Sequence, residues 1–69
     1  MHELTITQNI LDIALNAASQ QNARFIHTIR LRMGPFSGVV PECVQMYLDV
    51  LAKGTVAEGA KIEVTTVPL

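Results

Sequence analysis

The chain has few aromatic residues, little charge and almost no cysteine, and each shortage excludes a class of protein. Two phenylalanines, one tyrosine and a net charge of −1 leave no basic surface on which bases could stack, so we expect no nucleic acid partner. The single cysteine, Cys43, has no partner in the chain for a disulfide, which favours a reducing compartment such as the cytoplasm.

Long apolar runs are missing as well. No run approaches the roughly 18 residues that cross a bilayer, and the first residues lack the basic and apolar regions of a signal peptide. We therefore expect a cytoplasmic protein with no membrane partner.

Apolar residues are nevertheless abundant, at 49% of only 69 residues. A domain of this size has much surface and a small core that contributes only a few kcal/mol. Either this core is well filled, or part of the apolar surface belongs to an interface.

The apolar pattern predicts four elements, beginning with a helix over residues 4–21. Thr5 and Gln8 fit a capping box that would start regular helix near residue 6, and Asn22 would end it. Two adjoining stripes are predicted to be buried: Leu4, Leu11, Leu15 and Ala18, and Ile6, Ile10, Ile13 and Ala17.

The remaining elements are a strand over 24–33, a helix that runs from Pro41 to a cap at Gly54, and a strand over 61–67. Turns at 34–38 and around Gly59 separate them. The predicted inward residues are Phe25, His27, Ile29, Leu31 and Met33 in the first strand, Val44, Tyr47, Leu48 and Leu51 in the second helix, and Ile62 and Val64 in the second strand.

The order helix, strand, helix, strand predicts an α/β (α+β) fold with two helices packed on one face of a small sheet. Two strands are few, because an isolated two-stranded sheet is only marginally stable in water. We expect another chain, a further strand or the N-terminal segment to complete the sheet.

The chain begins Met-His-Glu, which is a candidate metal site. The Met1 amine, the His2 amide nitrogen and the His2 imidazole can close fused chelate rings on one ion, and the Glu3 amide nitrogen can complete a square plane. Square-planar nitrogen ligation is diagnostic of Ni(II) or Cu(II). A histidine at position 2 is also a common solvated terminal residue, so the residues alone leave both interpretations open.

Other candidate residues give weaker signals. We interpret His27 as a core or rim histidine, Cys43 as a small buried hydrophobe, and Glu42 and Asp49 as a solvated helix face. The chain contains no phosphate-binding loop, dinucleotide fingerprint or CxxC pair, which argues against an enzyme. An enzyme that uses Cys43 stays as an alternative that thiol reactivity would test.

The opening MHELTITQNIL and the stretch over residues 31–68 resemble the HypA/HybF family of hydrogenase nickel-incorporation proteins. The family's MHE opening is matched by residues 1–6. Its motif R-[IL]-G-x-[LF]-S-G-V-V-P-E is matched by residues 32–42, with Met33 and Pro35 as variants, and its motif K-G-T-x-A-E-G-A by residues 53–60.

The resemblance implies a nickel metallochaperone. It implies that Ni(II) binds the Met1 amine, the imidazole and amide of His2 and the backbone of Glu3. Delivery to a hydrogenase large-subunit precursor, and in some organisms to urease maturation, would involve a HypB-like GTPase. The alternative is a truncated HypA-like interaction or dimerisation module without metal delivery.

Members of this family continue after a Val-Pro pair, here Val67 and Pro68, into a zinc module with CxxC-type pairs, and then return to the sheet with a final strand. Residues 1–69 contain neither, so we expect a HypA-like nickel-binding domain without zinc. Unpaired strand edges recruit other chains, and we therefore expect a homo-oligomer, most simply a C2 dimer formed by strand addition or swapping.

Overall fold

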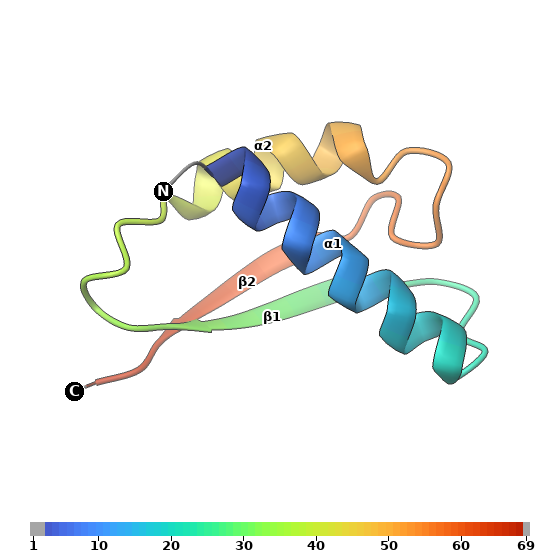
Figure 1. Cartoon of the computed structure of the whole chain (residues 1–69), viewed down its shortest axis with the longest axis horizontal. Helices are drawn as coiled ribbons and strands as arrows, with labels where there is room; N and C mark the ends of the chain where they lie inside the picture. Colours follow the sequence, from blue (N-terminus) through green and yellow to red (C-terminus); the bar gives the residue numbers. More distant parts are fainter. Residues whose placement is uncertain (1–2, 69) are drawn as a thin grey trace.

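The computed structural model describes residues 3–68. Its elements are α1 (Glu3–Gln20), β1 (Thr28–Met33), α2 (Pro41–Leu51) and β2 (Lys61–Thr66), which confirms the predicted order (Figure 1). Both helices pack on one side of the sheet (Figure 1). On the other side the strand residues are exposed, except Thr28, which is half-buried. None of the helices in this part of the chain is long and apolar enough to span a membrane.

The sheet consists of β1 and β2 in parallel, with α2 as the crossover between them. Thr28 lies opposite Lys61 at one end and Met33 opposite Thr66 at the other. The prediction that Ile62 and Val64 point inward is confirmed, because both are half-buried while their neighbours in β2 are exposed.

The core lies between the helices, the inner face of the sheet and the turns before β2. α2 contributes the two largest fully buried apolar side chains, Val44 and Leu48, and Tyr47 and Leu51 are half-buried, which confirms the predicted apolar face. The central cluster consists of Leu11, Leu48, Ala52, Ala57 and Ala60, and the side chains of Leu15, Ile26, Ile29, Leu51 and Ile62 pack around it.

The start of α1 and part of its buried face differ from the prediction. The helix begins at Glu3, so Thr5 lies inside it, and the predicted capping box was wrong. The buried residues are Thr7, Leu11 and Ala18. Residues Leu4, Ile13 and Ala17 are exposed, because α1 buries one narrow side against α2 and the sheet rather than two full stripes.

The end of α1 was predicted correctly. Asn22 adopts a left-handed conformation with φ 54°. Its N–H donates to the Ser19 carbonyl at 3.2 Å, and the Ala23 N–H donates to the Ala18 carbonyl at 2.9 Å. These two bonds form a Schellman motif, which ends the helix just before Asn22.

The predicted first strand was too long at its start. β1 begins at Thr28, and the predicted burial of Phe25 and His27 was wrong, since Phe25 is 70% exposed and His27 is exposed. Instead Ile26 packs against the core. The Ile26 N–H donates to the Val56 carbonyl at 2.8 Å, and this loop contact, not a strand ladder, sets which side chain points inward.

The boundaries of α2 and β2 also differ slightly from the prediction. α2 ends at Leu51 with Ala52 as its cap, so Gly54 is not the cap. Gly54 lies two residues further on, at φ 79°, and its N–H donates to Glu58 Oε1 at 2.9 Å. Gly59, at φ 80°, is the predicted turn residue before β2, which ends at Thr66 rather than Val67.

Candidate functional site

The predicted metal site lies at the start of α1. Met1 and His2 lie outside the described residues, so the structure places only Glu3 of the predicted ligands. Glu3 is half-buried and is the first residue of the helix.

The two backbone groups of Glu3 have different roles. The first N–H groups of a helix have no acceptor within it, so the Glu3 amide nitrogen lies outside the hydrogen-bond ladder of α1. The Glu3 carbonyl oxygen, by contrast, accepts a hydrogen bond of 2.7 Å from Thr7 Oγ1. The peptide between Glu3 and Leu4 is therefore held in place, while the amide nitrogen of Glu3 takes no part in the hydrogen bonds of the helix.

The end of the molecule at which α1 begins carries acidic residues. Figure 1 shows the first turns of α1 and α2 at the same end of the molecule, and each carries an acidic residue, Glu3 and Glu42. The two helices together contain four carboxylates and no basic residue: Glu3, Asp12, Glu42 and Asp49. Of these, Glu3 and Glu42 lie in the first turns, and Asp12 and Asp49 lie further along the helices.

The other candidate residues do not assemble into a second site. His27 lies in the exposed segment before β1, with its ring centroid 6.0 Å from that of Phe25. Cys43 is half-buried, and Glu42 and Asp49 are exposed as expected. Between residues 3 and 68, no three His, Cys, Asp or Glu side chains gather closely enough to hold a metal ion.

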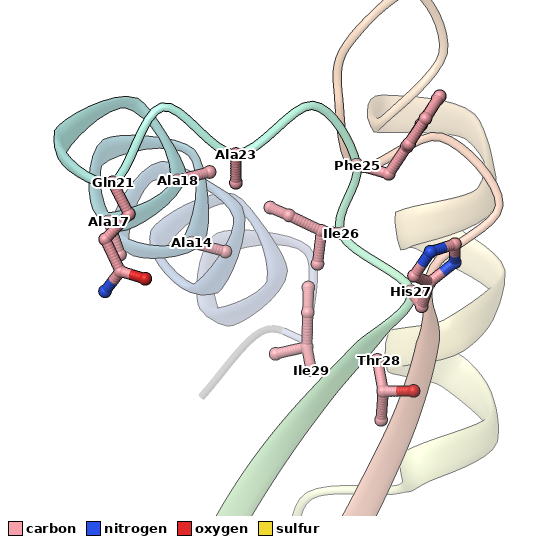
Figure 2. A pocket seen from close by; sticks show the side chains of 10 residues that line it. All are labelled: Ala14, Ala17, Ala18, Gln21, Ala23, Phe25, Ile26, His27, Thr28 and Ile29. Atoms are coloured by element: carbon pink, nitrogen blue, oxygen red, sulfur yellow. The ribbon is translucent and has the colours of Figure 1, made fainter.

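A shallow pocket of about 340 Å³ lies between the second half of α1 and residues 25–29 (Figure 2). Figure 2 shows Ile26 and Ile29 pointing toward α1, whereas the rings of Phe25 and His27 point to the other side of the segment. Among the residues that line the pocket, only His27 has a titratable side chain, so the pocket lacks an acid–base pair. Sequence reasoning missed the pocket because it assigned residues 24–27 to a strand.

The sequence matches the model of a protein family over residues 1–69. That family is described as hydrogenase/urease nickel incorporation, metallochaperone, hypA. The chain belongs to the HypA family. The match confirms the resemblance that was based on the Met-His-Glu opening and the two internal motifs.

Curated relatives named hydrogenase maturation factor HypA agree with this family assignment. The chain is 42% identical to the protein of Methanopyrus kandleri over 64 residues, which covers 93% of this chain and 45% of that protein. It is 37% identical to the protein of Acidithiobacillus ferrooxidans over 68 residues, or 99% of this chain and 60% of that protein.

A third HypA relative, from a Picosynechococcus species, is 42% identical over 69 residues, or 100% of this chain and 61% of that protein. The chain therefore spans between 45% and 61% of the length of these relatives.

Proposed function

We propose that residues 1–69 are the nickel-binding domain of a HypA metallochaperone, which takes up Ni(II) at Met1, His2 and Glu3 for hydrogenase maturation. The observation that carries this proposal is that the family match extends over the whole chain and includes the Met-His-Glu opening. Nickel is the cargo of the protein, which acts as a carrier and not as an enzyme.

The chemistry of the donors supports this proposal. The Met1 amine, the His2 amide and imidazole, and the Glu3 amide provide four nitrogens for a planar ion such as Ni(II), and each amide nitrogen loses its proton to water as it binds. Since Glu3 is the first residue of α1, a metal bond to its amide nitrogen would break no hydrogen bond of the helix. A site at the end of the chain with few side-chain ligands also suits a carrier that must release its ion.

The proposed protein partners are a hydrogenase large-subunit precursor, a HypB-like GTPase and a second copy of this chain. The outer edge of β1 supports the last of these. The His27 and Met33 carbonyls accept hydrogen bonds from the N–H groups of Lys61 and Val67. The backbone groups of the alternate residues Thr28, Arg30 and Arg32 therefore point away from β2. No other strand among residues 3–68 pairs with this edge.

The test is a nickel titration by calorimetry and absorbance of protein that keeps its native N-terminus. We expect one Ni(II) per chain, and we expect His2→Ala or acetylation of the Met1 amine to abolish binding. His27→Ala is the matched control, because His27 is the other histidine of the chain and lies far along it, in the exposed segment before β1.

Unchanged nickel binding in His2→Ala would contradict the proposed ligand set. A wild-type chain that forms dimers but takes up no nickel would favour the alternative function, an interaction module without metal delivery.

A further inference from the structure

Thr7 is the only buried polar residue among residues 3–68, and 0% of it is exposed. It lies on the inward side of α1, one turn before Leu11. Valine has nearly the same shape and would fill this position without burying a hydroxyl group. Threonine is also a mediocre helix former, because its branched side chain loses rotamer freedom and its hydroxyl competes for backbone groups. The hydroxyl therefore needs an explanation.

The Thr7 hydroxyl donates its hydrogen bond to the Glu3 carbonyl, with 2.7 Å between the oxygens. This is an ordinary length for a well-formed O–H···O bond. The N–H of residue 7 points at the same carbonyl in a regular helix, so both lone pairs of that oxygen face one residue. Because Thr7 is buried, water competes poorly for the bond.

These contacts fix the peptide between Glu3 and Leu4, and with it the Cα atom of Glu3. The first turn of a helix otherwise tends to fray, since its end residues make few hydrogen bonds. An anchored Cα atom limits the positions that the Glu3 amide nitrogen can take relative to the rest of α1. Groups that orient a metal ligand from behind in this way are worth about ten- to a hundredfold in metal affinity.

We propose that Thr7 is a positioning residue of the nickel site: its hydroxyl anchors Glu3 so that the Glu3 amide nitrogen is already placed for the metal. This inference rests on the proposed function, because it assumes that nickel binds at Met1, His2 and Glu3. Thr7 does not touch the ion and acts only through the backbone of Glu3.

The test compares Thr7→Val, which removes the hydroxyl, with Thr7→Ser, which keeps it. Ni(II) is titrated into the whole chain with its native N-terminus, and the absorption band of planar Ni(II) is recorded. We expect Thr7→Val to bind nickel about tenfold more weakly, with less of the planar band. Thr7→Ser should keep the wild-type spectrum and an affinity close to that of the wild type.

Folding is measured separately, by circular dichroism and thermal unfolding without nickel. Thr7→Val should unfold at no lower temperature than the wild type, because valine suits a buried helix position. Thr7→Ser loses a buried methyl group and should be the less stable of the two. If Thr7 affected nickel binding only through stability, Thr7→Val would bind nickel at least as tightly as Thr7→Ser. The proposal expects the opposite order. If the valine variant does not fold, Thr7→Ser and Thr7→Ala make the same comparison.

Wild-type affinity and spectrum in Thr7→Val would overturn this inference, and so would equal losses in the valine and serine variants. The His2→Ala variant separates the two proposals. If wild-type binding does not depend on His2, the proposed function fails. If it depends on His2 and ignores the Thr7 hydroxyl, only the role of Thr7 fails.

Discussion

The side-chain amide of Gln45, in α2, forms two hydrogen bonds of the kind that a neighbouring strand would form. Its Nε2 donates to the Ala60 carbonyl at 3.0 Å, and its Oε1 accepts the Ile62 N–H at 2.7 Å. The Ala60 carbonyl, just before β2, and the Ile62 N–H, in β2, both point away from β1. Nε2 also donates to Asp49 Oδ1 at 2.8 Å, which holds the amide in this orientation.

We predict that Gln45→Leu lowers the free energy of unfolding by about 2 kcal/mol, because it leaves the Ala60 carbonyl and the Ile62 N–H without a protein partner. Urea unfolding measures the difference. Asp49→Ala is the control: it removes only the exposed bond to Gln45, and it should change the stability by less than about 0.5 kcal/mol. Equal losses in the two variants would contradict the role given to Gln45.

Protons should compete with nickel at the proposed site. The Met1 amine and the His2 imidazole bind the metal only in their deprotonated forms, so nickel affinity should fall as the pH falls. Nickel titrations at a series of pH values measure this dependence. His27→Ala should give the wild-type profile, and an affinity that does not change with pH would argue against amine and imidazole ligands.

The sequence-based prediction succeeded for the elements whose burial is one-sided and regular. The inward residues of α2 and β2 were correct because each element buries one face against its neighbours. It failed where a contact distant in sequence decides the outcome. The bond between Ile26 and Val56 turns Phe25 and His27 outward, and the narrow contact of α1 leaves Ile13 71% exposed.

The donors of the candidate site were proposed from the sequence, but its support could not be. The chemistry of an N-terminal amine next to a histidine suggested nickel, and the structure adds the position of Glu3 at the start of α1. The hydroxyl of Thr7 could not be predicted, since a threonine on an apolar stripe looks like an imperfect core residue. The ligand set of Met1 and His2 stays a prediction, because both lie outside the described residues.

α2 should be the most sensitive element of the fold. Leu48 is almost fully buried in the central cluster, so Leu48→Ala should lower the free energy of unfolding by about 2–5 kcal/mol. That is most of the stability expected of so small a domain. Val50→Ala on the same helix is the control, because Val50 is 63% exposed. Urea unfolding should show only a small change for Val50→Ala. Similar losses of stability in the two variants would contradict the central position of Leu48 in the core.

The turn after α2 depends on a glycine. Gly54 adopts φ 79°, where a side chain is strained, so Gly54→Ala should cost about 1 kcal/mol in thermal unfolding. Gly34→Ala is the matched change, since an added Cβ there meets nothing within 4 Å and Gly34 lacks a positive φ. It should be neutral or slightly stabilising. A Gly54 variant as stable as the Gly34 variant would contradict this account.

The described part of the chain exposes nine large hydrophobic residues. They lie in the helices and in the segments outside β1 and β2: Leu4, Ile13, Phe25, Phe36, Val40, Met46, Val50, Val56 and Val67. Together with the unpaired edge of β1, this surface favours association with another chain.

We predict a dimer by light scattering at micromolar concentration. Arg30→Pro should shift it to monomer, because proline removes an N–H that points away from β2 and leaves the bonds between β1 and β2 intact. Arg30→Ala is the control and should stay dimeric, since the ion pair of Arg30 with Glu63 is exposed and contributes little. A wild-type monomer would contradict the prediction, and a dimeric Arg30→Pro would exclude this edge.

The side chain of Gln45 makes the two outer edges of the sheet differ in the backbone groups that are open to another strand. A strand of another chain can add along the outer edge of β1. At the outer edge of β2, the Gln45 side chain already occupies the first hydrogen-bonding groups. Because Gln45 blocks the start of the outer edge of β2, we expect a second copy of the chain to add at β1 and not at β2. We expect association of this sort to stop at a dimer rather than continue into a ribbon, which would protect a chain this rich in apolar residues from forming fibrils.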